Sequence, residues 1–300
     1  MSNTVGSIYV VGAGRVGSVL AMLFKQAGLD LCGIWSRTEE GARLATERTG
    51  LHCDNGALTG ALAEALTNAN TVVLAVRDDA VAQVAKELCE SGKLGMGKVV
   101  LHCGGALPAR KAMPDLVDSA TVGTFHPLVA VADVEAAQQM LPSAFFALEG
   151  DEKAVQVGRA LATAIGARSF VLDAEQMGLY HVAAAMASNH AVALWDVAQG
   201  LLEKVGLEKD RAREALLPLL QSTLENVQRV GLPEALTGPV RRGDTKTIQK
   251  HLEILSQHAP QYLGFYRAAT AVAAEVARTC KDPPPEAKLQ AIAALLNDES

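Results

Sequence analysis

A glycine-rich turn near the start of the chain constrains the fold more than any other stretch. Residues 8–11 form a short apolar run, glycines follow at positions 12, 14 and 17, and an amphipathic pattern continues to Ala27. In such a strand–turn–helix, the first glycine permits the tight turn, the second lets the backbone approach a pyrophosphate, and the third allows helix and strand to pack closely. The free N–H groups of the helix then face the phosphates. This context predicts a dinucleotide-binding βα unit.

The residues of this turn that we expect to contact the cofactor are Gly12, Ala13, Gly14, Arg15, Val16 and Gly17. The alternative is a glycine-rich βα turn that binds no ligand, because the motif alone is weak. Its position between a β-branched run and an amphipathic helix favours the dinucleotide.

Composition limits the classes of protein that this chain can form. The 300 residues correspond to about two domains, and 49% hydrophobic with 20% charged residues is typical of a globular protein. The net charge of -6 comes without any block of lysine and arginine, so we expect no nucleic-acid partner.

The cysteines and apolar runs indicate an intracellular location. Five scattered cysteines never form a Cys-x-x-Cys spacing, which argues against a disulfide framework and against a metal site. The first strand begins within ten residues of Met1, which leaves no room for a signal peptide, and the apolar run 182–195 is too short to span a bilayer. We therefore expect a cytoplasmic protein with no membrane partner and no metal.

The residues after the second expected strand, 31–35, indicate which dinucleotide binds. Ser36, Arg37 and Thr38 stand where NAD-specific sites usually carry an acid. Two hydroxyls and a guanidinium suit the 2′-phosphate of NADP instead. The alternative is that Arg37 is a solvated residue at the start of the helix 39–49.

The βα alternation predicts where other site residues lie. Ligands of an open α/β sheet bind outside the carboxyl ends of its strands. The expected strands 71–76, 98–101 and 121–125 end at residues that we predict to contact cofactor or substrate. These are Val76, Arg77, His102 and Gly104 for the cofactor, and His126 for the substrate. Alternatively, each histidine only ties down its own loop.

Strand patterns stop near Leu172, and only helical periods follow. We therefore predict an α/β Rossmann domain with a doubly wound parallel sheet, residues 1–172, followed by an all-helical domain, residues 173–300. In the Rossmann domain we also expect a weak strand at 51–53, a helix at 57–66, a helix to Glu90 capped by Asp79, and strands 144–149 and 169–172 around a helix 152–165. In the helical domain we expect helices at 174–205, 209–230, 245–258 and 260–280, and another after 285.

The helix 174–205 carries an unusual polar stripe. Tyr180, His181, Ser188 and Asn189 recur at helical spacings on an otherwise apolar helix. Buried polar groups need partners, which a ligand, a second helical layer or a dimer mate would supply.

Several motifs together resemble one family. The sequence is similar to bacterial oxidoreductases that join an NADP-binding Rossmann domain, like that of deazaflavin-dependent NADP oxidoreductases, to a helical domain of uncharacterised function. The resemblance covers nearly the whole chain and rests on 12–17, 35–37, 102–106, 125–128, 149–151, 180–189 and 236–244. It implies a relation to ketopantoate reductase, pyrroline-5-carboxylate reductase and the 6-phosphogluconate and β-hydroxyacid dehydrogenases. It thereby implies a 6-phosphogluconate dehydrogenase C-terminal-like helical domain and a homodimer formed through it.

The chain departs from that family at two positions. A lysine usually stands where this chain has Met177, and a serine is common where it has Gly104. Histidine titrates near neutrality, so His181 would replace the lysine as the general acid, oriented by Asn189 or Ser188.

A second group of candidates interrupts the helical domain. The segment 237–244 breaks the helical pattern, and such breaks free backbone groups to meet a ligand. Arg241 or Arg242 would clamp a substrate carboxylate, with Thr237 and Tyr180 also contacting the substrate. Alternatively, the arginines pair with local acids such as Asp244.

Together these features predict an NADP-dependent oxidoreductase that transfers a hydride to or from a small carbonyl or imine metabolite that bears a carboxylate. One alternative hydride partner is a deazaflavin or flavin. Another possibility is a catalytically silent NADP-binding regulatory or scaffold protein, which Met177 favours.

Overall fold

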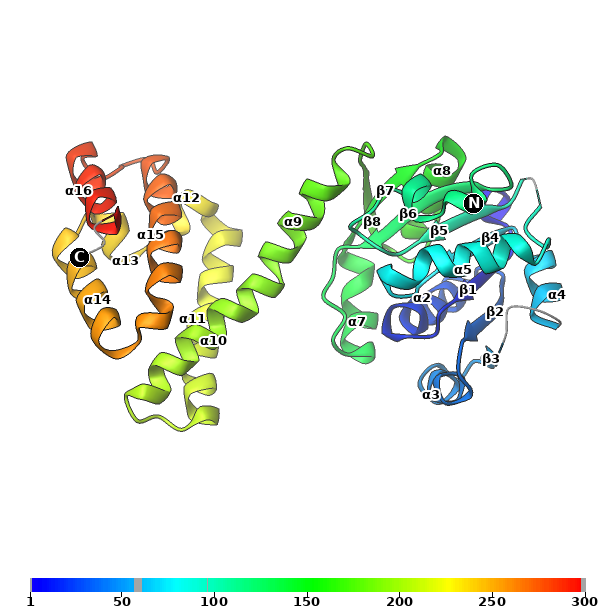
Figure 1. The fold of residues 1–300 in the computed structure, drawn as a ribbon, viewed down its shortest axis with the longest axis horizontal. Helices are drawn as coiled ribbons and strands as arrows, with labels where there is room; N and C mark the ends of the chain where they lie inside the picture. Colours follow the sequence, from blue (N-terminus) through cyan, green and yellow to red (C-terminus); the bar gives the residue numbers. More distant parts are fainter. Residues whose placement is uncertain (1, 57–60, 96, 298–300) are drawn as a thin grey trace. The chain divides into compact units, whose positions relative to one another are not determined.

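The computed structural model describes residues 2–56, 61–95 and 97–297. The chain divides into two compact units, Met1–Ser188 and Asn189–Ser300. The first unit holds the strands and the second is helical (Figure 1). The predicted Rossmann sheet followed by an all-helical region is confirmed.

The first unit is built on a sheet that has eight strands within the described residues, in the order β3-β2-β1-β4-β5-β6-β7-β8. Neighbouring strands run parallel except β6 and β7, which are antiparallel. The order of the first six strands is that of the doubly wound dinucleotide-binding sheet. The strands are β1 (Ile8–Val11), β2 (Leu31–Ser36), β3 (Asp54–Asn55), β4 (Thr71–Leu74), β5 (Val99–His102), β6 (Thr121–Pro127), β7 (Phe145–Gly150) and β8 (Arg168–Val171).

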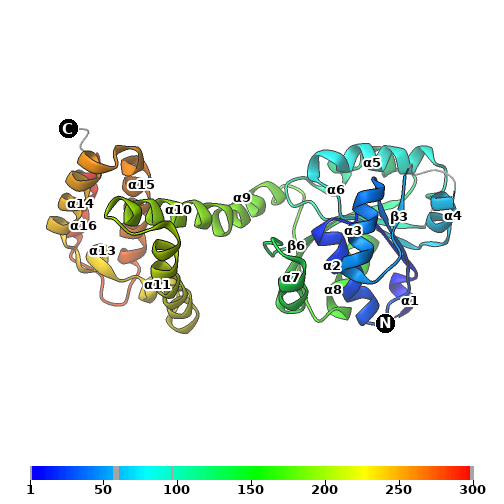
Figure 2. The ribbon, with the colours of Figure 1, turned by 90° about the horizontal axis from the view of Figure 1, so that it is seen from below.

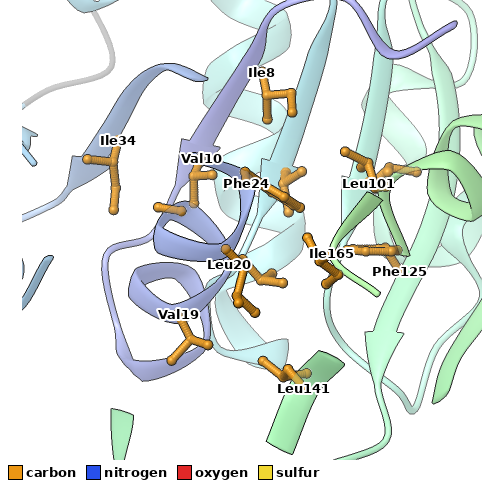
Figure 3. Close-up of a cluster of buried hydrophobic side chains, with 14 of the residues drawn as sticks. Ile8, Val10, Val19, Leu20, Phe24, Ile34, Leu101, Phe125, Leu141 and Ile165 are labelled. Carbon is orange, nitrogen blue, oxygen red and sulfur yellow. The ribbon is translucent and has the colours of Figure 1, made fainter. Parts of the chain in front are cut away.

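Both faces of the sheet are covered, which explains why its central strands are continuously apolar. Successive strand residues point to opposite faces. Ile8 and Val10 of β1 join a core cluster with Phe24 (Figure 3), whereas Tyr9 and Val11 join the cluster on the other face. Helices α2, α3, α7 and α8 contribute to the first cluster, and α4, α5 and α6 contribute to the second.

The helices of the first unit mostly follow the predicted pattern. They are α1 (Ser2–Val5), α2 (Arg15–Gln26), α3 (Glu39–Thr49), α4 (Ala61–Asn68), α5 (Asp78–Glu90), α6 (Ala109–Ala112), α7 (Val134–Met140), α8 (Glu152–Ala164) and α9 (Met177–Ala187), with 3-10 helices η1 (Pro114–Leu116) and η2 (Leu141–Ser143).

Three local expectations differ from the structure. The weak third strand was expected at 51–53 and lies at 54–55, where Asp54 and Asn55 pair with β2. Asp79 was expected to cap α5, but Arg77 occupies the N-cap position and pairs with the Asp79 carboxylate. The first four residues of the expected helix 57–66 lie outside the described residues.

The glycine turn joins β1 to α2 at very close range. Gly12 has a φ of 106°, which favours glycine. A Cβ on Gly17 would lie 1.8 Å from the main-chain oxygen of Gly12, so only glycine fits there. A Cβ on Gly14 would meet nothing within 4 Å. Gly12 and Gly17 are therefore required by packing, whereas Gly14 leaves open space in front of the helix.

The second unit contains the remaining helices. They are α10 (Asn189–Lys204), α11 (Lys209–Val230), α12 (Leu232–Ala235), α13 (Gly238–Arg242), α14 (Thr245–His258), η3 (Pro260–Tyr262), α15 (Leu263–Arg278) and α16 (Glu286–Asn297). Helices α13 to α16 lie side by side around a small core that includes Ile248, Leu289 and Ile292 (Figure 2). Asp244 caps α14 by accepting a hydrogen bond from the Thr247 N–H, and Pro218 lies inside α11.

The expected single helix 174–205 is divided. Its helical pattern is interrupted at Ser188, which separates α9 from α10. The compact units divide at the same place, after the predicted boundary at residue 172. Helix α9 packs with the first unit because Met177 is fully buried there and Tyr180 bonds to His126.

We predict that Gly17→Ala destabilises the first unit by at least about 2 kcal/mol, because the new methyl group meets backbone that must shift. Gly14→Ala is the matched control, since Gly14 has a φ of -69° and open space around it. Thermal unfolding of both variants measures the difference. Equal midpoints for the two variants would contradict the packing role of Gly17.

Candidate cofactor and active site

The carboxyl ends of four neighbouring strands bring most predicted site residues to one edge of the sheet. The register aligns Val11 with Leu74, Leu74 with His102, and His102 with Thr124. Because adjacent strands lie about 4.8 Å apart, β1 and β6 are separated by roughly 14 Å along this edge. The glycine turn, the residues after β4, and both histidines therefore belong to one row.

The start of α2 is the first element of this row. Its N-cap residue is Gly14, which has no side chain to satisfy the first N–H groups of the helix. Val76, after β4, lies against Gly12, because a Cβ on Gly12 would be 2.8 Å from Val76 Cγ1. Ala13 is buried, Val16 packs on the core, and Arg15 donates to the main-chain oxygen of Ala132. Among the described residues no side chain caps the first amide groups of α2, so these groups can hold an anion.

The segment at the end of β2 carries an exposed cation, Arg37. Thr38 caps α3 by accepting a hydrogen bond from the Gly41 N–H at 3.1 Å. Arg37 is exposed and has no hydrogen bond or ion pair within the described part of the chain. Ser36 Oγ lies next to Gly41, where a Cβ would be only 2.3 Å from it. Arg37 is therefore available to a ligand, while Thr38 also has a structural role.

Arg77 is less available than predicted. Its guanidinium forms a bidentate pair with Asp79, at 3.1 and 2.6 Å, on the protein surface. An exposed pair of this kind is weak, so the contact does not prevent Arg77 from meeting a ligand.

His102 is part of a buried chain of hydrogen bonds. Thr124 Oγ1 donates to Glu149 Oε2 at 3.1 Å, and the same carboxylate oxygen accepts the Ala109 N–H at 2.7 Å. His102 Nε2 lies 2.9 Å from Thr124 Oγ1. Because the threonine hydrogen goes to Glu149, His102 Nε2 must be the donor in that contact. Its Nδ1 then accepts the Gly104 N–H, at 3.2 Å.

Burial keeps this histidine neutral. His102 is 1% exposed, and burial, followed by the nearby His126, lowers its pKa to about 4. Gly104 is also enclosed, since a Cβ there would lie 2.7 Å from Asp78 Oδ1 and 3.2 Å from His102 Nδ1. Of the two expectations for His102, the geometry fits the one in which the imidazole holds its own loop.

His126 has a different environment, because it faces α9. Its Nδ1 lies 2.6 Å from the Tyr180 hydroxyl, and its ring centroid is 6.3 Å from that of His181. Phe170 packs against the Tyr180 ring, with centroids 5.8 Å apart. Nδ1 of His181 is buried and has no hydrogen-bond partner among the described residues. A buried imidazole nitrogen without a partner is a position where a ligand atom can bind.

The charge state of this cluster is set by burial. Burial, followed by the charge of His181, lowers the pKa of His126 to about 4. Burial raises the pKa of Tyr180 to about 12. At neutral pH the imidazole of His126 and the phenol of Tyr180 are therefore both uncharged. Perturbed pKa values in a cluster of this kind are typical of functional sites.

The other predicted residues are less closely tied to His181. Ser188 ends α9, and Asn189 is exposed at the start of α10; within the described residues neither forms a hydrogen bond to His181. In the second unit, Thr237 is the exposed N-cap of α13. Arg241 donates to the main-chain oxygen of Asp282 at 2.6 Å. The Asp244 carboxylate accepts from Thr247.

Sequence reasoning gave no role to Thr124, Glu149 or Phe170. Thr124 and Glu149 face each other across the antiparallel pair β6–β7. A signal was present, because Glu149 is an acid in an otherwise apolar strand and Thr124 lies two residues before His126. Buried polar residues next to a predicted site histidine were the available indication.

The described residues contain no group of His, Cys, Asp and Glu that could hold a metal ion. None of the helices described here combines the length and apolar character needed to cross a membrane. The five cysteines are free thiols.

The fold and the edge of the sheet define a Rossmann-like domain joined to a helical domain. Residues 2–127 match a Rossmann-like domain, and residues 144–273 match a domain of unknown function, DUF2520. The predicted combination of a Rossmann-like N-terminal domain and a helical C-terminal domain of uncharacterised function is therefore confirmed. No curated protein matches the chain.

Solved structures share the fold. A Bacteroides fragilis protein, BF3122, named as a candidate NADP oxidoreductase, has 24% identity and a TM-score of 0.69, with 91% of this chain and 99% of that chain covered. Protein TM1727 of Thermotoga maritima has 24% identity and a TM-score of 0.71, with 91% and 98% covered. Pyrroline carboxylate reductase of Plasmodium falciparum, solved with NADP bound, has 13% identity and a TM-score of 0.59, with 99% and 100% covered.

We predict that stability falls as the pH drops from 6.5 to 4, because unfolded His102 binds a proton in that range and folded His102 does not. The contribution is on the order of 3 kcal/mol. His102→Gln should reduce the slope of thermal midpoint against pH in this range without abolishing it, because His126 has a similarly lowered pKa. His52→Gln, at an exposed histidine of the same unit, should leave the slope unchanged. An unaltered slope in the His102 variant would contradict the assignment.

Proposed function

We propose that this protein is an NADP-dependent oxidoreductase that transfers a hydride between the nicotinamide and the carbon of a small carbonyl or imine. The observation that carries the proposal is a shared sheet edge: the bare N-terminus of α2 lies at one end, and the His126–Tyr180–His181 cluster adjoins β6. The structural neighbours named as NADP oxidoreductases and reductases support it. NADP would supply the hydride chemistry, and the protein would bind, orient and protonate.

The residues of the glycine turn fit the pyrophosphate of that cofactor. The open space at Gly14 admits a ligand close to the backbone, and the first amide groups of α2 would bind the phosphate oxygens. Val76 would pack beside the turn, and Arg37, with Ser36 and Thr38, would bind the 2′-phosphate. His102 and Gly104 would shape the nicotinamide end of the site through the loop that they fix.

We predict that Arg37→Ala reduces the preference for NADP over NAD by about 10- to 150-fold, because one charge-assisted hydrogen bond is lost. Arg48→Ala is the control, since Arg48 is an exposed arginine on the neighbouring helix α3. Dissociation constants of NADPH and NADH measure the effect. Tighter binding of NADH than NADPH by the unaltered protein would contradict the choice of cofactor.

The proton would come from His181. Met177 is fully buried, so the position at which the related family has a lysine does not present a polar group here. His181 has a buried nitrogen with no hydrogen-bond partner among the residues that the structure describes, and it lies beside His126. We propose that His181 protonates the substrate oxygen or nitrogen, and that Ser188 or Asn189 orients it.

We predict that His181→Ala lowers kcat by about 100-fold and leaves the dissociation constant of NADPH unchanged, because only the proton donor is removed. His190→Ala, at an exposed histidine of α10, should have no effect on either quantity. Steady-state rates and fluorescence titration measure the two. Normal turnover by the His181 variant would show that the proton comes from elsewhere.

The proposed substrate bears a carboxylate. Arg241 is held by the main chain of residue 282, whereas Arg242 is exposed and within the described chain has no hydrogen bond. Arg242 would therefore bind the carboxylate, with Thr237 at the start of the same short helix. His126 and Tyr180 would contact the reacting end of the substrate.

We also propose a homodimer formed through the helical unit. Several large apolar side chains on α10 and α11 are exposed, among them Val192 (70%), Leu219 (64%) and Leu224 (57%). Large apolar side chains that remain exposed on two neighbouring helices commonly mark a protein interface. Sedimentation should give twice the mass of one chain.

Free thiols at all five cysteines are compatible with the proposed cytoplasmic location.

A further inference from the structure

The His126 ring contacts both candidate groups of α9. Tyr180 and His181 are consecutive in the helix, and both rings meet His126 edge-on, with centroids 5.6 and 6.3 Å away. Of these two side chains, Tyr180 forms a hydrogen bond with it, at 2.6 Å. His126 is therefore placed to control the direction in which the Tyr180 hydroxyl donates.

The opposite edge of the His126 ring is enclosed by the loop after β5. A Cβ on Gly105 would lie 2.8 Å from His126 Nε2, so the backbone of this loop approaches the ring closely. The same loop is held by the bond from the Gly104 N–H to His102. The buried chain through Thr124 and Glu149 thus fixes the loop against which His126 rests.

The hydrogen bond between His126 and Tyr180 has two possible directions. A neutral imidazole carries one hydrogen, and a phenol carries one. If the phenol donates to Nδ1, its hydrogen is used within the protein. If Nδ1 donates to the phenol oxygen, the phenol hydrogen is free for a ligand. Both rings are uncharged at neutral pH, so neither direction requires separated charges.

We infer that His126 donates from Nδ1 to Tyr180, and that Tyr180 donates its own hydrogen to the reacting oxygen or nitrogen of the substrate. This inference rests on the proposed function. Tyr180 is then a further catalytic residue, and His126 is a positioning residue that acts through it. A phenol that accepts one hydrogen bond becomes a stronger donor in another.

Tyr180 keeps its proton throughout the proposed step. The substrate carbon accepts the hydride with its electron pair, and the π pair of the double bond moves to the oxygen or nitrogen. For a carbonyl, negative charge develops on the oxygen, where Tyr180 stabilises it by a hydrogen bond. His181 then supplies the proton to the same atom. Donors directed at developing charge are commonly the strongest single contribution to catalysis.

Three variants test the inference. Tyr180→Phe keeps the ring that packs on Phe170 and removes only the hydroxyl. It should lower kcat about 100- to 1000-fold, with NADPH affinity unchanged and only a small drop in thermal midpoint from the lost hydrogen bond to His126. His126→Asn places an amide near the position of Nδ1, and its kcat should fall by less than about tenfold. His126→Gln places the amide near the position of Nε2, and its kcat should fall as much as that of Tyr180→Phe. Equal losses for Asn and Gln, or full activity of Tyr180→Phe, would overturn the inference.

The direction of the hydrogen bond can be measured without turnover. Nitrogen-15 chemical shifts of histidine in the full chain distinguish the Nδ1–H from the Nε2–H tautomer. The inference expects Nδ1–H at His126 in the unaltered protein, and an Nε2–H signal would overturn it. A protein that oxidises no NADPH with any carbonyl, imine or flavin contradicts the proposed function. Normal turnover by the unaltered protein, together with full activity of the Tyr180→Phe variant, contradicts only the present inference.

Discussion

The contact between Gly17 and the main-chain oxygen of Gly12 is the constraint on which the candidate site depends. With no Cβ at position 17, α2 starts directly at the end of β1, and its first amide groups lie at the carboxyl edge of the sheet. The parallel register of β1, β4, β5 and β6 then aligns the ends of these strands in the same row. A larger residue would move the helix away from that row.

The two histidines at this edge of the sheet have different roles because their surroundings differ. His102 is enclosed by Thr124, Glu149 and the following loop, and each of its nitrogens has a protein partner. His126 lies two residues beyond Thr124 and faces α9, where its partner is a tyrosine. Its neighbour there is a histidine whose Nδ1 has no hydrogen-bond partner in the described part of the chain. The first histidine therefore stabilises the loop that encloses the second.

Much of this arrangement could be predicted from sequence, because it follows from local patterns. The apolar strands and the glycine turn indicated the sheet and its edge, and both histidines were expected there. The break at Ser188 was not predicted, although Ser188, Asn189 and His190 interrupt the apolar run there and serine and asparagine favour helix ends over helix interiors. The pairing of Thr124 with Glu149 could not be predicted, because it depends on the antiparallel register of β6 and β7. The burial of Met177 likewise depends on tertiary packing of α9.

The most direct test of the account is transfer of deuterium from NADPH labelled at the nicotinamide C4 position. The unaltered protein would be incubated with a panel of small keto acids, cyclic imines and flavins, and the products analysed by mass spectrometry. The account predicts that deuterium appears on carbon in the hydroxy-acid or amine product of a keto acid or imine, with NADPH oxidised in equal amount. Label that enters only a flavin, or NADPH that binds tightly and is never oxidised, would contradict it.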